Sequence, residues 1–455
     1  MSTERPRPPS VETVLVAVRA SVDGVRETGA MLSAAREVVA DERGRLSAGE
    51  EPRDADRLAA EVVERLDAFD AATPGRVINA TGVIVHTNLG RAPWPDAAIR
   101  AAADAAAGYL LLELDRESGR RGARLRVAED HLIALTGAED ALVTNNNASA
   151  LALAVGLAGR GGGVLVSRGE LVEIGGGVRI PEIVRRAGAK LIEVGTTNRT
   201  RAEDFEGPLS DGRARLVLRV HPSNFTMSGF IEAPEPALLA GLAHRHGAIV
   251  VDDLGSGALL ATEAFGLLHE PMPSERLAAG ADVVTFSGDK LVGGPQAGLV
   301  VGRADLIARM RRDPLARAMR PDKATLAGVA ATLGLYRSGR AVAAIPVWSM
   351  IAMAPAAIRV RAESAAAALG GAVAEVVALE STVGGGSLPG ETLVSFGIAL
   401  RSRSATRVLG ALRRGSPPLV ARIADGRVVL DLRTVDPADD DRLVPAIAAA
   451  LVTLA

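Results

Sequence analysis

The chain has 455 residues, a formal net charge of −2 and 48% hydrophobic residues, of which few are aromatic. A chain of this length is too long to fold around one small hydrophobic core, so two or three domains are expected. The near-neutral charge provides no global field for binding a polyanion. There is no cysteine, which excludes disulfides, thiolate metal ligands and a thiol nucleophile on this chain.

Two further exclusions concern metals and membranes. The six histidines are scattered, and His244 and His246 lie only two residues apart in an expected helix, a spacing that turns their side chains away from each other. We therefore expect no metal site. Residues 1–30 lack the apolar core of a signal peptide, and no apolar run reaches the roughly 18 residues of a membrane span. A cytoplasmic location is expected.

Residues 1–72 differ from the rest of the chain. A proline-rich turn at 5–9 precedes a helical pattern, and a second pattern carries Leu58, Val62, Leu66 and Phe69 on one stripe. This segment holds ten arginines against fifteen acidic residues. The sequence predicts a small helical domain over 1–72.

From about residue 140, apolar β-branched runs alternate with helical patterns such as 148–157 and 236–246. This rhythm predicts an α/β domain, assigned to 73–334, with a mostly parallel seven-stranded sheet covered by helices. A smaller α+β domain is expected over 335–455, with a helix at 358–369 and strands near 393–400 and 427–432. The seven strands are expected at 141–144, 164–167, 190–194, 216–220, 248–251, 282–286 and 298–301.

The segment FSGDKLVG at 286–293 carries the strongest chemical signal. Lys290 follows an apolar strand, with Ser287 before it and a glycine pair after it. A lysine there can form an imine with a bound aldehyde while the serine hydroxyl holds a phosphate, as pyridoxal phosphate requires. Asp289, next to Lys290, is a further candidate catalytic carboxylate. The alternative is a surface lysine in a glycine loop.

Pyridoxal phosphate also needs a carboxylate for its ring nitrogen, a phosphate cradle and a partner for its ring hydroxyl. Asp252, at the end of the strand near 248–251, is the predicted carboxylate, and Asp253 is its rival.

The cradle is predicted at Asn146 and Asn147, where a helix begins, although these asparagines could instead be helix caps. Asn224 is the candidate for the ring hydroxyl, and a loop over 170–177 could cover one ring face. The sequence has neither a GxxxxGK[ST] phosphate loop nor a suitably placed GxGxxG.

With these residues in place, the chain resembles bacterial selenocysteine synthase, the L-seryl-tRNA(Sec) selenium transferase family, from about residue 73 to 435. The resemblance is carried by ordered blocks along the sequence: RVINATG at 76–82, HTNLGRAP at 86–93, SRGELVEIGG at 167–176, VGTTNRT at 194–200, FSGDKLVGGPQAG at 286–298, GGGSLPG at 384–390 and DLRTV at 431–435.

The resemblance implies an aspartate-aminotransferase type of fold, with Lys290 as the Schiff-base lysine of pyridoxal 5′-phosphate. It implies conversion of seryl-tRNA(Sec) to selenocysteinyl-tRNA(Sec) with selenophosphate, by β-elimination to an aminoacrylyl intermediate followed by selenium addition. It also implies a homo-oligomer built from dimers, possibly a ring. Residues 1–72 would help to bind the tRNA.

An anionic selenium donor needs guanidinium groups, and Arg91, Arg317 and Arg320 are the predicted ones. Residues 303–323 contain seven basic residues against three acidic ones, a pattern that a solvated helix face also produces. Two other functions stay open. One is a pyridoxal-phosphate lyase of the same fold acting on a small amino acid or amino sugar acid. The other is a non-catalytic RNA-binding or scaffold protein.

Overall fold

The computed structural model describes residues 7–21, 28–71, 75–122, 126–174 and 177–454. The chain divides into two compact units, Met1–Val77 and Ile78–Ala455, and each is described by itself. Among the helices of the described ranges, none combines the length and the hydropathy needed to cross a bilayer.

The described residues of the first unit form three helices, α1 (Val11–Ser21), α2 (Thr28–Ser47) and α3 (Ala55–Ala71). Leu58, Val62 and Leu66 of the predicted stripe are buried in its core with apolar residues of α1 and α2. The side chain of Phe69 lies outside the described residues, as do Arg5 and Pro6 of the expected turn. Besides the apolar core, a buried carboxylate stabilises the unit: Glu42 accepts hydrogen bonds from Arg53 Nε at 2.7 Å and Arg45 Nη1 at 2.8 Å.

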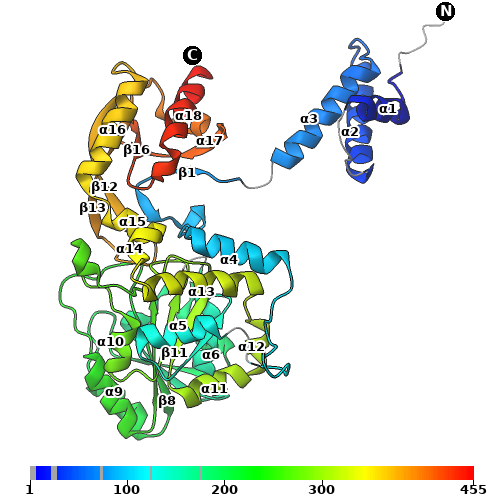
Figure 1. Ribbon diagram of the computed structural model, residues 1–455. Coiled ribbons are helices and arrows are strands. Elements are labelled where there is room, and N and C mark those ends of the chain that lie inside the picture. The colour runs from blue at the N-terminus through cyan, green and yellow to red at the C-terminus, as the bar shows by residue number, and fades with distance from the viewer. Residues whose placement is uncertain (1–6, 22–27, 72–74, 123–125, 175–176, 455) are drawn as a thin grey trace, which may run out of the picture. The chain divides into compact units, whose positions relative to one another are not determined.

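The second unit contains the predicted seven-stranded sheet (Figure 1), with strand order β3-β11-β10-β9-β8-β4-β7. Only β11 runs antiparallel to its two neighbours, and the other adjacent strands are parallel. All seven predicted strands are found. Their bounds are β3 Asp140–Thr144, β4 Gly163–Ser167, β7 Lys190–Val194, β8 Ala214–Val220, β9 Ile249–Gly255, β10 Val283–Ser287 and β11 Gly298–Gly302.

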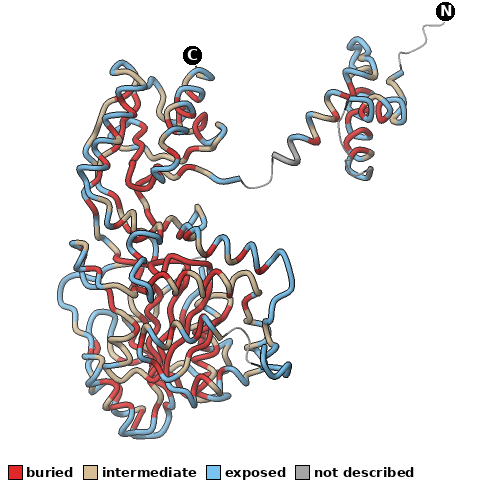
Figure 2. Tube along the Cα trace, in the orientation of Figure 1, coloured by how far each residue is buried: buried red, intermediate tan, exposed pale blue. Residues whose placement is uncertain are grey.

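Helices cover both faces of this sheet, because successive side chains of a buried strand point to opposite faces. In β8, Leu216 and Leu218 pack in one apolar cluster with α6 (Asn147–Gly156), whereas Val217 packs in another with α9 (Pro236–Arg245). Figure 2 shows the buried residues concentrated along these strands. The other helices around the sheet are α4 Asp96–Ala107, α5 Val127–Thr136, α7 Ile180–Arg186, α8 Glu203–Ser210, α10 Pro273–Ala278, α11 Ala304–Arg312, α12 Pro314–Ala318 and α13 Lys323–Arg337.

This unit also contains a five-stranded sheet, with strand order β15-β16-β13-β12-β2. The predicted strands near 393–400 and 427–432 are β13 (Thr392–Leu400) and β16 (Arg427–Asp431), and the predicted helix at 358–369 lies within α16 (Pro355–Leu369). Further elements of this unit are β2 Val83–Val85, β12 Ala374–Gly384, β15 Arg422–Ala424, α14 Ala341–Ala344, α15 Pro346–Ala352, α17 Ala405–Arg414 and α18 Asp440–Val452. Two short strand pairs accompany them, β1 (Ile78–Asn79) with β14 (Leu419–Val420) and β5 (Glu173–Ile174) with β6 (Val178–Arg179).

Two features cut across the predicted domain boundaries. The strand β2 pairs with β12, through Val83↔Thr382 and Val85↔Gly384, so a segment assigned to the large domain belongs to the C-terminal sheet. The boundary between 334 and 335 lies inside α13, and residues 78–455 form one compact unit. The long sequence separation of β2 and β12 explains why local patterns did not reveal their pairing.

Candidate active site

Lys290 lies in the turn between β10 and β11, at the edge of the large sheet where the parallel strands end. It is 7% exposed and lines a cavity of about 330 Å³. Ligands of open α/β sheets bind at this edge, beyond the carboxyl ends of the strands. The predicted residues Arg91, Asn146, Asn147, Asn224, Ser287, Asp289 and Lys290 all line this cavity.

The surroundings of Lys290 favour a neutral amine. Burial lowers the pKa of its ammonium group, and the charge of Arg91 lowers that pKa further. Gly386 closes the cavity over the amine: a Cβ atom on this glycine would lie 2.5 Å from Lys290 Nζ, and the φ of +81° also favours glycine. The lysine is thus held as a buried nucleophile of restricted mobility.

This lowered pKa predicts how the stability of the cofactor-free protein depends on pH. Between the lowered pKa and the ordinary 10.5, the unfolded chain binds more protons at this lysine than the folded chain, so stability rises with pH in that window. Lys290→Met removes this dependence. We expect the variant to be more stable than wild type at pH 7, with the difference shrinking toward pH 10.5. Urea midpoints across this range measure it, and a wild type as stable as the variant at pH 7 would contradict it.

The structure places Asp253, which was the alternative to Asp252, in the cavity of Lys290. Asp252 and Asp253 both lie inside β9, which continues to Gly255, so their side chains point to opposite faces. Asp253 lines the cavity of Lys290, whereas Asp252 does not and lies 3.6 Å from Arg276 Nε. The structure therefore places Asp253, and not the predicted Asp252, where a carboxylate can reach a ring in this cavity.

Asp253 is held by two hydrogen bonds to its Oδ1, from Asn147 Nδ2 at 2.8 Å and from Thr285 Oγ1 at 3.0 Å. Burial raises its pKa, and these hydrogen bonds only partly offset the effect. A protonated pyridine nitrogen in the cavity would offer this buried carboxylate a cationic partner. The chemistry of the site therefore suits the ring of pyridoxal phosphate.

The asparagine turn forms the start of α6. Asn146 is the N-cap, and its side chain accepts a hydrogen bond from Ser149 N at 2.9 Å, so the capping alternative holds for this residue. Asn147 Oδ1 is buried without a hydrogen bond among the described residues. The free N–H groups of a helix start and the hydroxyl of buried Ser287 are suitable partners for a phosphate. The residues present thus fit the cofactor at its phosphate end as well.

Asp289 and Asn224 each form a hydrogen bond within the protein that limits what they can bind in the cavity. Asp289 Oδ2 accepts a hydrogen bond from Arg91 Nη1 at 2.8 Å, which ties this arginine to the Lys290 turn. Arg91 has a φ of +66°, an uncommon conformation for a residue other than glycine. Asn224 donates from Nδ2 to Glu173 O at 2.9 Å, so its predicted donor is engaged in the protein.

The loop over 170–177 contributes an apolar wall through Val172, which lines the cavity with Val178 beyond it. Glu170 is turned away into an ion pair with Arg219 at 3.1 Å. Gly175 and Gly176 lie outside the described residues. Sequence reasoning did not single out Thr87, His221, Ser223 and Gln296, which also line the cavity. His221 could have been noticed, since it directly follows β8 at the same edge of the sheet.

Comparison with known proteins decides the family. The L-seryl-tRNA selenium transferase family matches residues 77–436. The chain is 45% identical to the L-seryl-tRNA(Sec) selenium transferase of Rhizobium meliloti (strain 1021), over 83% of each chain. It is also 45% identical to that of Moorella thermoacetica, over 88% of this chain and 86% of that protein. The chain belongs to the L-seryl-tRNA selenium transferase family.

This membership confirms the resemblance expected from the sequence blocks. Among solved structures, the chain is similar to D-glucosaminate-6-phosphate ammonia-lyase, with a TM-score of 0.61 and 21% identity over 85% of this chain and 99% of that chain. At that identity the likeness concerns the fold alone, and it agrees with the α/β fold class predicted here.

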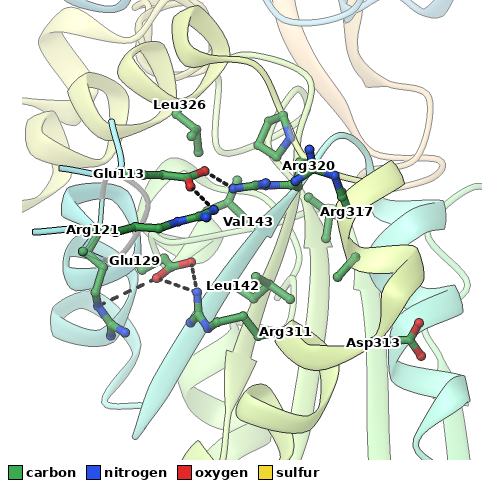
Figure 3. Close-up of a pocket in the computed structure, with 15 residues that line it drawn as sticks. Glu113, Arg121, Glu129, Leu142, Val143, Arg311, Asp313, Arg317, Arg320 and Leu326 are labelled. Atoms are coloured by element: carbon green, nitrogen blue, oxygen red, sulfur yellow. Dashed lines mark hydrogen bonds and ion pairs between the residues drawn. The ribbon is translucent and has the colours of Figure 1, made fainter. Parts of the chain in front are cut away.

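Within this selenium transferase chain, Arg317 and Arg320 do not reach the cavity of Lys290. They line a separate cavity of about 400 Å³, together with residues of β3 and α12 (Figure 3). Arg320 pairs with Glu113, and Arg311 pairs with Glu129 at 2.9 Å in the same cavity. Only Arg91 of the three predicted donor-site arginines lies beside Lys290. The two sites are adjacent, because Asn145 N in the asparagine turn donates to Met319 O at 2.8 Å.

Proposed function

We propose that this chain converts L-seryl-tRNA(Sec) into L-selenocysteinyl-tRNA(Sec), with pyridoxal 5′-phosphate as cofactor and selenophosphate as selenium donor. The observation that carries the proposal is a buried lysine in a cavity whose groups fit this cofactor, in a chain of the selenium transferase family. Family membership supports the transfer and the tRNA substrate. The identity of the donor is our inference from the anion-binding groups.

The cofactor, when bound, supplies an electron sink for the carbanion formed at the α-carbon of serine. Asp253 would hold the ring nitrogen of this cofactor. Lys290, the residue that would carry the cofactor, would be placed to take the α-proton, and burial favours the deprotonated form of its amine by lowering the pKa. Asp289 positions Arg91 beside this amine through their 2.8 Å hydrogen bond. The serine β-hydroxyl leaves as water, selenium from selenophosphate becomes bonded to the β-carbon, and hydrolysis of the selenium–phosphorus bond releases inorganic phosphate.

Arg91 is the donor-site arginine that a single chain provides next to Lys290. We propose that Arg317 and Arg320 complete the donor site from a neighbouring copy in a homo-oligomer built from dimers, possibly a ring. Support comes from the exposed apolar residues Tyr109, Leu111 and Leu114, which flank Glu113, the partner of Arg320. A contiguous apolar stretch beside a basic cavity is typical of a surface covered by another subunit.

A subunit-mixing experiment tests this arrangement. Lys290→Ala and the double variant Arg317→Ala/Arg320→Ala should each be inactive alone. Mixed dimers would contain one site with an intact lysine and intact arginines, so random exchange should restore about one quarter of the wild-type activity. The measurement is selenium transfer after the two proteins are dissociated and reassembled together. Activity that stays at the level of the separate variants would mean that the arginines do not act across subunits.

We further propose that the helical unit of residues 1–77 helps to bind the tRNA. Its excess of acidic residues restricts such contact to local basic positions, of which Arg53, Arg57 and Arg65 gather along one surface cavity. Because the tRNA substrate is used in protein synthesis, we place the reaction in the cytoplasm.

Single-turnover assays test the proposed function. Purified holoenzyme, seryl-tRNA(Sec) and selenophosphate should yield selenocysteinyl-tRNA(Sec), detected after mild ester hydrolysis by mass spectrometry. Seryl-tRNA(Ser) is the matched control and should remain unchanged. Absence of product with wild-type holoenzyme, together with ammonia release from a free amino acid or amino sugar acid, would establish the lyase alternative instead.

A further inference from the structure

A second cavity of about 350 Å³ lies beside the cavity of Lys290, and His221 lines both. Two loops separate them. In the loop after β8, Ser223 and Asn224 line the Lys290 cavity, while Pro222 and Phe225 line the second cavity. In the glycine-rich loop, Gly386 touches Lys290 and Leu388, two residues on, lines the second cavity. A ligand that spans these loops would enter both cavities.

The second cavity is mainly apolar at its mouth. Met227, Ile231 and Leu268 line it and rank among the exposed large apolar side chains, with exposed fractions of 36%, 42% and 67%. Phe225 lines it from the wall next to the Lys290 cavity. An exposed apolar surface of this kind around an aromatic side chain is suited to a flat ring system.

One carboxylate oxygen at this site has no hydrogen-bond partner among the residues that the structure describes. Glu270 is 2% exposed and lines the second cavity, and among the described residues no donor makes a hydrogen bond to its Oε1. His221 Nε2 lies 3.3 Å from that oxygen without hydrogen-bond geometry. A buried polar atom without a partner is costly, so a ligand hydroxyl that donates to Glu270 would be favoured.

We propose that this second cavity binds the 3′-terminal nucleoside of the aminoacylated tRNA, with Phe225 against the base and Glu270 accepting a hydrogen bond from the ribose. The inference rests on the proposed function, because it names the part of that substrate next to the reacting serine. The serine carboxyl is esterified directly to a ribose hydroxyl. The ribose must therefore lie within a few bonds of the amino group that meets Lys290.

The chemistry of the cavity matches this ligand at both ends. Carboxylates recognise ribose hydroxyls in nucleotide sites, and Glu270 Oε1 lies 3.3 Å from Nε2 of His221, which also lines the Lys290 cavity. A ribose bound at Glu270 thus lies beside the reacting centre. Bases stack on aromatic side chains without regard to their hydrogen-bonding edges, which suits Phe225 and the apolar mouth.

Binding of a stable substrate fragment to the holoenzyme tests the proposal. The probe is 3′-(L-seryl)amino-3′-deoxyadenosine, an amide that resists hydrolysis, and L-serinamide is the control without a nucleoside. Calorimetry should give at least about tenfold tighter binding for the probe. Phe225→Ala should remove about tenfold of the probe's affinity and leave L-serinamide unaffected. Phe225→Tyr, which keeps the ring, should retain the wild-type preference.

The role of Glu270 is tested by a double-mutant cycle with the 2′-deoxy form of the probe. Glu270→Gln and removal of the 2′-hydroxyl should each weaken binding, and their combination should cost little more than either alone. Equal affinities of the probe and L-serinamide for the wild type, or a Phe225→Ala effect of the same size on both ligands, would overturn the proposal. Conversion of full-length seryl-tRNA(Sec) decides the proposed function separately, since it can succeed while the probe shows no preference.

Discussion

Lys290→Ala is expected to abolish selenium transfer, with a loss of at least about 10⁴-fold. General-base catalysis alone contributes about 10²–10⁴-fold, and this lysine also carries the cofactor covalently. Its burial and the tight approach of Gly386 leave no other described lysine in the cavity that could replace it. The variant should fold, because alanine removes a buried amine without a partner charge in direct contact.

The measurement is single-turnover transfer at saturating pyridoxal phosphate, with circular dichroism to confirm folding. Lys290→Arg is the matched control, since it keeps a long side chain but its guanidinium stays protonated and cannot form the bond to the cofactor. Both variants should be inactive and should lack the long-wavelength absorbance of the bound cofactor. Turnover by Lys290→Ala near the wild-type rate would show that the catalytic lysine has been misassigned.

Asp253→Asn is expected to lower the transfer rate by about 10²-fold or more, while Asp252→Asn leaves that rate nearly unchanged. The loss of a preorganised charge from a buried site typically costs about 10²–10³-fold. Asp253 faces the cavity and holds Asn147 at the start of α6. Asp252 faces Arg276 on the other side of the sheet, so its replacement should lower the free energy of unfolding instead, by about 1 kcal/mol or more.

The pair is a sharp test because the two residues are adjacent and chemically identical. Transfer rates and urea midpoints of both variants should separate the effects, one on chemistry and the other on stability. If Asp252→Asn abolished selenium transfer and Asp253→Asn retained it, two conclusions would be wrong. These are the side of the sheet to which each aspartate of β9 points and the choice of the ring carboxylate.

The sequence was sufficient to predict the seven strands of the large sheet, because each is a short β-branched run between helical patterns. It was also sufficient to select Lys290, since one motif places the lysine, a serine and a glycine pair at a strand end. The choice between Asp252 and Asp253 failed because it depends on where β9 ends. The run appeared to stop at residue 251, whereas the strand continues to Gly255 and puts the second aspartate in the cavity.

Other parts of the site depend on contacts between distant segments. The second cavity is assembled from loops as far apart as Gly169 and Glu391, so no single local pattern in the sequence reveals it. Asn224 was predicted from residue type alone, and only the structure shows its amide donating to Glu173 O. Arg317 and Arg320 were grouped with Arg91 because an anionic donor needs guanidinium groups, and within one chain these arginines lie in two cavities.

The central claim is that the cofactor is bonded to Lys290, and borohydride reduction tests it most directly. Reduction of the reconstituted holoenzyme followed by proteolysis and mass spectrometry should give one pyridoxyl-modified peptide, with the modification on Lys290. A modification on another lysine, or none from fully reconstituted protein, would contradict the assignment on which the proposed chemistry depends.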